Sequence, residues 1–81
     1  MKISVEISYY PLQPEFVTPI LGFIRALNTY EDIRVVTNGM STQIFGTYDR
    51  VMEILTREIK KAFEEPHSVF VMKIINADLQ D

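Results

Sequence analysis

The chain has 81 residues, which is the size of one small domain. It contains no cysteine, which excludes disulfides, thiolate zinc sites and cysteine nucleophiles, and its single histidine excludes a metal site built from several histidines. A net charge of −3 argues against nucleic-acid binding, and no apolar run reaches the ~18 residues that would span a membrane. We therefore expect one cytoplasmic domain over residues 1–81, without metal or cofactor.

The first predicted element is a strand over residues 2–10. Apolar residues from Ile3 to Tyr9 alternate with polar ones, as in a strand with one buried face. Pro11 ends it, because proline lacks a backbone donor. A helix follows, with Thr18 predicted as its N-cap and Pro19 in its first turn; a start near Glu15 is the alternative. The apolar stripe of this helix is Ile20, Phe23, Ile24 and Leu27.

Residues 33–46 are predicted to form a β-hairpin. Its turn is Asn38-Gly39, because both residues tolerate positive φ. A second helix is expected to begin after Thr47 or Asp49 and to stop at Pro66. On its polar side, Glu53 and Arg57 are spaced to form an ion pair. The apolar stripe of this helix is Val51, Met52, Leu55, Ile59, Ala62 and Phe63.

The last predicted strand covers residues 69–76, and residues 77–81 are expected to be a frayed polar tail. The element order β-α-β-β-α-β predicts an α+β, ferredoxin-like sandwich. In this fold a four-stranded antiparallel sheet, in the order 4-1-3-2, carries both helices on one face. The other face is then left without a cover.

The uncovered sheet face is predicted to be partly apolar. Phe45, Val71 and Ile75 lie on it by alternation, and burying them would stabilise a contact by several kcal/mol, at about 1.5–3 kcal/mol per side chain. We expect a homo-oligomer, a dimer or tetramer, formed through this face or through the last strand. A monomer with an apolar sheet face is the alternative.

Glu6 lies in the middle of the uncovered face and needs a positive partner if that face is buried. Lys2, Lys73 and Arg34 are candidates for a structural ion pair. A cationic ligand is the alternative.

Catalysis is not expected. His67 follows Glu65-Pro66 in a predicted loop, where a histidine is ordinarily solvated, and the three glycines are too scattered to form a phosphate-binding loop. Carboxylate pairs such as Glu31-Asp32 and Glu64-Glu65 lie at the ends of elements and are expected to be solvated. We therefore expect a protein that is not an enzyme.

A cluster of polar residues lies near the predicted hairpin turn. Thr37 and Thr42 point toward the helix layer by alternation, next to Asn38, Ser41 and Met40. Buried hydroxyls need partners. Either backbone and water satisfy them, or they line a small pocket with a few polar groups in an apolar wall. Both interpretations remain open at this point.

Three segments resemble the YkoF-related, thiamine-binding protein family. Ser8-Tyr9-Tyr10-Pro11-Leu12 is similar to its first-strand S-x-Y-P-L motif. Residues 38–46 resemble its third strand, and residues 47–52 resemble the start of its second helix. The three matches run in order over most of the chain.

The resemblance implies a ferredoxin-like domain, used in oligomers or as tandem copies, that binds thiamine or its hydroxymethylpyrimidine moiety without known catalysis. Ser8, Tyr10 and Thr42 match motif positions and are expected ligand contacts. The polar cluster adds Thr37, Asn38 and Met40. The leading hypothesis is a non-catalytic small-molecule binding protein. The alternative is a structural or regulatory oligomerisation domain with an interface ligand or none.

Overall fold

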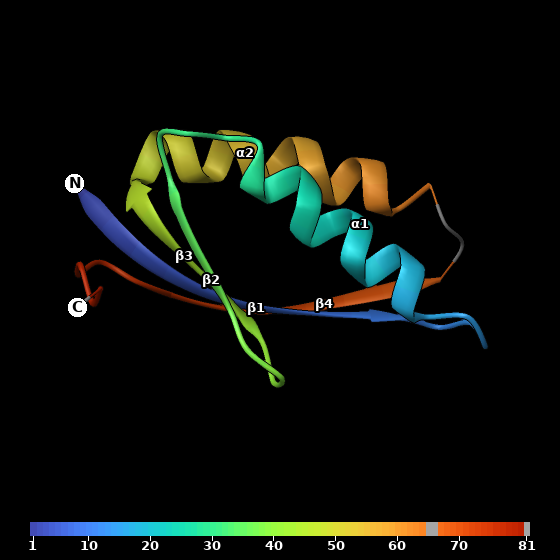
Figure 1. Cartoon of the computed structure of the whole chain (residues 1–81). Helices are drawn as coiled ribbons and strands as arrows, with labels where there is room; N and C mark the ends of the chain where they lie inside the picture. Colours follow the sequence, from blue (N-terminus) through green and yellow to red (C-terminus); the bar gives the residue numbers. More distant parts are fainter. Residues whose placement is uncertain (65–66, 81) are drawn as a thin grey trace.

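The computed structural model describes residues 1–64 and 67–80. The predicted order of elements is confirmed (Figure 1). The predicted helix stop at Pro66 and the carboxylate of Glu65 lie outside the described residues. The elements are β1 (Lys2–Pro11), α1 (Val17–Asn28), β2 (Arg34–Thr37), β3 (Thr42–Thr47), α2 (Tyr48–Ala62) and β4 (Ser68–Ile75).

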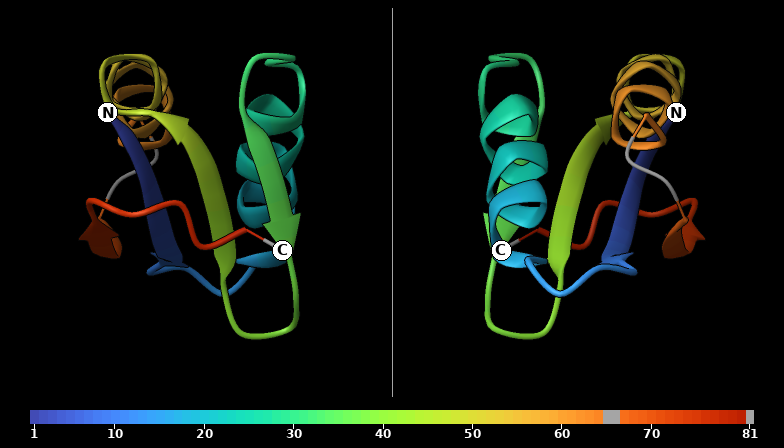
Figure 2. Two further views of the ribbon diagram at one scale, coloured as in Figure 1. Left: turned by 90° about the vertical axis from the view of Figure 1, so that its left-hand side faces the viewer. Right: turned by 90° about the vertical axis from the view of Figure 1, so that its right-hand side faces the viewer.

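The sheet is antiparallel with the strand order β2-β3-β1-β4, and both helices lie on one face of it (Figures 1 and 2). This is the predicted ferredoxin-like arrangement read from the opposite edge. Val5 of β1 lies opposite Ile44 of β3 and Ile74 of β4, so the predicted inside and outside faces of these strands are correct. The core between sheet and helices consists of Ile3, Val5, Ile7, Tyr9, Phe23, Leu27, Ile44, Val51, Ile54 and Leu55.

Helix α1 begins earlier than the predicted Thr18 cap. It starts at Val17, after Phe16, and the Thr18 hydroxyl does not cap it. Instead the Glu15 carboxylate accepts the backbone N–H of Thr18 at 3.0 Å. Pro19 lies in the first turn, where the N–H groups have no intrahelical acceptor, so its missing donor costs no hydrogen bond.

The hairpin is confirmed, but the predicted turn conformation is wrong. β2 and β3 are joined by the four residues 38–41, and no glycine described in the structure has positive φ. The side-chain oxygen of Asn38 accepts the N–H groups of Met40, at 2.8 Å, and Ser41, at 3.1 Å. The Asn38 N–H donates to the Ser41 carbonyl at 3.1 Å. Side-chain bonding by Asn38, rather than positive φ, therefore shapes the loop.

Helix α2 packs four residues of the predicted stripe, Val51, Leu55, Ile59 and Ala62, against the core, but it buries a wider face than that stripe. Ile54 and Glu58 are buried with Val51 and Leu55, whereas Phe63 follows the helix and is half exposed. A long helix packed against both a sheet and a second helix buries a wider face than one narrow stripe. Neither α1 nor α2 has the length and apolar character that a membrane span requires.

The C-terminal segment is not the predicted frayed tail. The Ser4 hydroxyl donates to the Ala77 carbonyl at 2.7 Å and accepts the Leu79 N–H at 2.9 Å. Gln80 accepts a hydrogen bond from Arg34 of β2 at 3.2 Å. The segment thus runs from β4 across β1 and β3 toward β2, on the sheet face without helices (Figure 2).

Candidate ligand-binding site

A cavity of about 420 Å³ lies where the second half of β1, the start of α1 and the hairpin loop meet. It opens there because β3 ends opposite Ile7 of β1, whereas β1 continues to Pro11. The hairpin loop forms one wall and α1 the other. This volume falls within the range of ordinary small-molecule pockets.

Every residue proposed from the sequence as a ligand contact borders this cavity. These residues are Ser8, Tyr10, Thr37, Asn38, Met40 and Thr42. The remaining lining residues are Ile7, Tyr9, Pro11, Leu12, Phe16, Ile20, Phe23, Ile24, Gly39 and Ser41. The cavity wall that Phe16 and Ile20 form at the start of α1 was not predicted from the sequence, because no motif relates these residues to the hairpin.

The two threonine hydroxyls at the base of the hairpin satisfy one another. Thr37 and Thr42 face each other across β2 and β3, and their hydroxyl oxygens are 3.2 Å apart. Thr42 is buried, but Thr37 is exposed, so the prediction of two buried hydroxyls holds for one of them only. The pair therefore needs no ligand, although one of its two protons is left free to donate.

The mouth of the cavity is apolar and exposed. Met40, at the hairpin tip, is 87% exposed, and Phe16, before α1, is 52% exposed. Exposed large apolar side chains on opposite sides of one opening offer contact surface to an apolar or flat molecule.

Two aromatic side chains, Tyr9 and Phe23, form the floor of the cavity on the helix side. The Tyr9 ring stacks on Phe70 of β4, with centroids 4.4 Å apart, and meets Phe23 of α1 edge-on at 5.5 Å. These contacts hold the Tyr9 side chain in the core, where it is 9% exposed. Its position in the floor is therefore fixed by packing.

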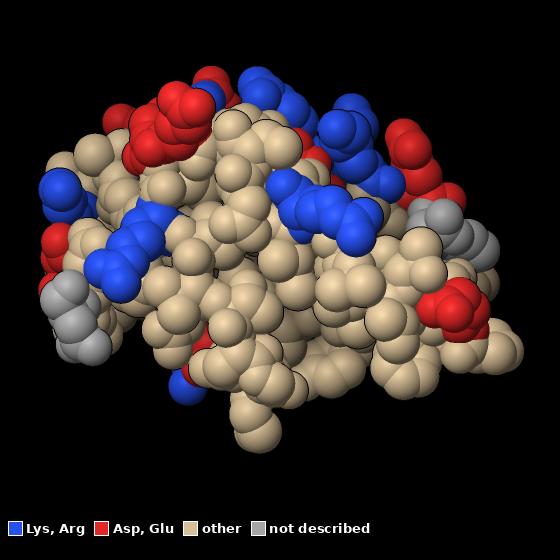
Figure 3. Space-filling model, viewed as in Figure 1, with Lys and Arg blue, Asp and Glu red and all other residues tan. Residues whose placement is uncertain are grey.

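The lining described above contains no charged residue. In Figure 3 the charged side chains gather mainly over the helix layer, and one positive and one negative group lie beside the hairpin tip. Within residues 1–64 and 67–80, no three His, Asp or Glu side chains are grouped so that they could hold a metal ion. The site thus offers apolar surface with a few hydrogen-bonding groups and no charged side chain.

Glu6 on the opposite face forms the structural ion pair that was one of its two predicted roles. Its carboxylate lies 3.0 Å from the Lys73 ammonium, directly across the strand pair, and accepts a hydrogen bond from the Ser41 hydroxyl at 3.1 Å. These hydrogen bonds, from Lys73 first and then Ser41, together with the positive charge, lower the pKa of Glu6. Ser41 thereby links the hairpin loop at the cavity to the uncovered face.

The uncovered face is less open than predicted. Phe45 is only 6% exposed, and a hollow of about 580 Å³ beside it is bordered by Leu79 of the C-terminal segment. The expectation that Phe45 forms an exposed contact surface is therefore wrong. Val71 and Ile75 of β4, by contrast, are 55% and 45% exposed.

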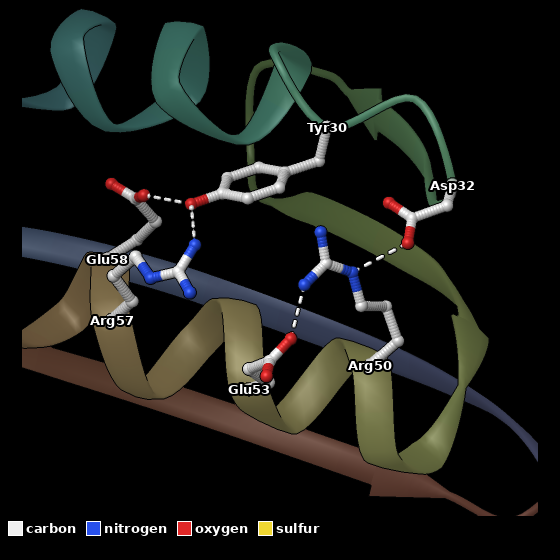
Figure 4. A network of polar contacts seen from close by, with 6 residues as sticks. All are labelled: Tyr30, Asp32, Arg50, Glu53, Arg57 and Glu58. Carbon is white, nitrogen blue, oxygen red and sulfur yellow. Dashed lines mark hydrogen bonds and ion pairs between the residues drawn. The ribbon is translucent and has the colours of Figure 1, made fainter.

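A second polar cluster, absent from the sequence predictions, joins the end of α1 to α2 (Figure 4). The Tyr30 hydroxyl donates to the carboxylate of buried Glu58 at 2.6 Å and accepts from Arg57 at 3.2 Å. Arg50 forms ion pairs with Asp32, at 2.6 Å, and with Glu53. Glu53 therefore pairs with Arg50 instead of the predicted Arg57. The Arg50 guanidinium lowers the pKa of Asp32. This cluster holds two elements together and borders no part of the cavity.

Comparison with solved structures places the fold among known proteins. Over 98% of this chain and 90% of the other, the structure matches protein SP2199 of Streptococcus pneumoniae, with 26% identity and a TM-score of 0.88. Hypothetical protein MJ1052 of Methanocaldococcus jannascii matches 99% of this chain and 84% of its own, with 20% identity and a TM-score of 0.80.

A third match is a Thermotoga maritima protein, TM0486, called a "putative thiamine biosynthesis/salvage protein". It matches 95% of this chain and 85% of its own, with 14% identity and a TM-score of 0.85. The chain has the fold of these proteins. At the level of the fold, the predicted resemblance is therefore confirmed. No protein-family model and no curated protein matches the sequence.

Proposed function

We propose that this protein is a non-catalytic binding protein for thiamine or its hydroxymethylpyrimidine moiety. The supporting observation is the uncharged cavity of about 420 Å³, bordered by Ser8, Tyr10, Thr42 and the hairpin loop. An aminopyrimidine is flat and offers both donors and acceptors, which suits an apolar cavity with a few polar groups. The fold shared with a protein named for thiamine biosynthesis or salvage points in the same direction.

Calorimetry tests this function. Titrating the protein with hydroxymethylpyrimidine and with thiamine should give saturable heat, and no heat with either at millimolar concentration contradicts the proposal. Thr42→Val removes a cavity hydroxyl and should weaken binding while the fold persists. Thr56→Val, on the exposed side of α2 and outside the cavity, is the matched control and should bind as the parent does.

We further propose that the protein acts as a homo-oligomer that associates through β4. This strand is at the edge of the sheet and eight residues long, and it carries exposed apolar side chains on both of its faces. On one face these are Val69, Val71 and Ile75, and on the other Met72 and Ile74. A long apolar edge strand is stabilised by pairing with a second copy.

This surface also favours the second candidate function, an oligomerisation domain with an interface ligand or none. Sedimentation at micromolar concentration distinguishes an oligomer from the 9.4 kDa monomer. Val71→Lys should shift the distribution toward monomer, whereas Glu64→Lys, on an exposed residue beyond α2, should not. An oligomer that gives no heat with either ligand supports the second candidate over the first.

A further inference from the structure

On the cavity side, the last part of β1 has no partner strand among the residues that the structure describes. The pairing of β1 with β3 ends at Ile7 opposite Thr42, whereas its pairing with β4 continues to Pro11 opposite Ser68. Residues 8–11 therefore have β4 on one side and the cavity on the other.

Hydrogen-bond alternation identifies the backbone groups on this free edge. In an antiparallel pair, one residue exchanges both of its bonds with the residue opposite, and the next residue turns both groups to the other side. The Leu12 N–H donates to the His67 carbonyl at 3.1 Å, one step beyond the Pro11–Ser68 pair. Even-numbered residues of β1 thus bond to β4, and the N–H and C=O of Tyr9 point to the cavity side.

The hairpin supports the same assignment from the other end. The Asn38 N–H donates to Ser41, so odd-numbered residues of β3 bond to β2 and even-numbered ones to β1. Thr42 is then the last residue of β3 that bonds to β1, through Ile7. The N–H groups of Met40 and Ser41 are taken by the Asn38 side chain, so the loop does not extend the pairing to Tyr9.

We propose that the Tyr9 backbone binds the ligand as a missing strand would, by donating its N–H to a ring nitrogen and accepting an amino proton with its C=O. This inference rests on the proposed function. It specifies the ligand class as a planar heterocycle in which a ring nitrogen adjoins an amino-bearing carbon, as in 4-aminopyrimidine.

The length and charge of the site separate this class from others. An extended peptide needs several consecutive backbone pairs, but Tyr9 alone offers both groups, because the next residue on this edge, Pro11, has no N–H. A phosphorylated ligand needs positive charge, and the described cavity lining has none.

Amide hydrogen exchange of the ¹⁵N-labelled full chain tests the proposal. In the free protein the Tyr9 amide should exchange at least about tenfold faster than the Ile7 amide, which is bonded to β3. Saturation with 4-amino-5-hydroxymethyl-2-methylpyrimidine should slow exchange at Tyr9 more than at Ile7, where only the overall stabilisation by the bound ligand acts. The analogue without the 4-amino group should bind about tenfold more weakly or worse, since the Tyr9 carbonyl is left unpaired.

The outcomes separate the two proposals. If the pyrimidine binds but Tyr9 exchange does not change, or if both pyrimidines bind equally, the backbone inference is wrong and the binding function stands. A Tyr9 amide already protected in the free protein also overturns the inference. If neither the pyrimidines nor thiamine give heat, both proposals fail.

Discussion

Among the described residues, the Tyr30 hydroxyl is the one group that donates a short hydrogen bond to the buried carboxylate of Glu58. Glu58 is 5% exposed, and its other partner, Lys61, lies 3.8 Å away with an exposed side chain. A buried charge that loses a donor keeps its desolvation cost without compensation. Tyr30 therefore contributes to stability through Glu58 as well as through its own packing.

We expect Tyr30→Phe to lower the free energy of unfolding by about 1–3 kcal/mol, measured by urea denaturation. Tyr48→Phe is the matched control, because the half-exposed Tyr48 hydroxyl makes no hydrogen bond with the described residues. In a Glu58→Gln background the same tyrosine change should cost less, since the buried charge is already gone. Equal losses in both backgrounds would show that the hydroxyl does not act through Glu58.

Glu6 makes stability depend on pH. The pKa of Glu6 is lower in the folded protein than the ordinary value of about 4.3. As the pH falls, the carboxylate therefore stays ionised to a lower pH in the folded state than in the unfolded state. The resulting stability is fully present above that ordinary pKa and is lost as the pH falls through the folded pKa. The urea midpoint of the parent should therefore fall more steeply below pH 4.5 than that of Glu6→Gln. Parallel pH profiles for the two proteins would contradict this assignment.

At the scale of elements, two glycines occupy opposite environments. A methyl group added at Gly46 of β3 would lie 3.0 Å from the Val51 side chain and 3.2 Å from that of Ile33. A methyl group added at Gly22 of α1 would meet nothing within 4 Å. Because Gly46 has no side chain, α2 and Ile33, the residue before β2, can approach β3 closely. Gly22 has no close neighbour of this kind.

We expect Gly46→Ala to destabilise the fold by about 1–3 kcal/mol, because Val51 is fully buried and has little room to move. Gly22→Ala should stabilise it by about 0.5–1 kcal/mol, because alanine favours an exposed helix interior. Thermal or urea unfolding of both variants measures the difference. A Gly46→Ala protein as stable as the parent would show that the contact at Gly46 relaxes freely.

The ends of elements were the least predictable from sequence. Thr18 and Asn38-Gly39 are strong local signals, but neither acts in the predicted way. Glu15 replaces Thr18 at the start of α1, and the Asn38 side chain bonds to the loop without positive φ. Several local solutions satisfy the same free N–H groups, and the surrounding chain decides between them.

For the whole molecule, the C-terminal segment determines how much of the uncovered sheet face is accessible. Ser4 holds it through Ala77 and Leu79, and its far end reaches Arg34 on the opposite edge strand. With Phe45 buried near this segment, the exposed apolar surface of the sheet shifts to β4. The proposed oligomer contact accordingly lies on the edge strand instead of the sheet centre.

We expect Ser4→Ala to release this segment, since one hydroxyl supplies both a donor and an acceptor to it. Amide exchange at Leu79 should accelerate about tenfold. Ser8→Ala, on the same strand and the same face, should leave Leu79 unchanged. Unchanged exchange at Leu79 after loss of the Ser4 hydroxyl would mean that other contacts hold the segment.

The sequence alone determined the order of elements and the two faces of each main strand, because alternation and helical spacing are set by the backbone period and need no distant partner. The order of elements in turn predicted the strand order, because few ways of connecting such elements are allowed. It also brought together Ser8, Tyr10, Thr37, Asn38, Met40 and Thr42, which all border the cavity. Only the tertiary structure decided that β1 extends past β3, that Tyr30 meets Glu58 and that the C-terminal segment lies over Ser4. Each of these features brings together residues that are far apart in the chain. Such contacts depend on the lengths and relative positions of elements that are packed together, and a local sequence pattern does not predict these.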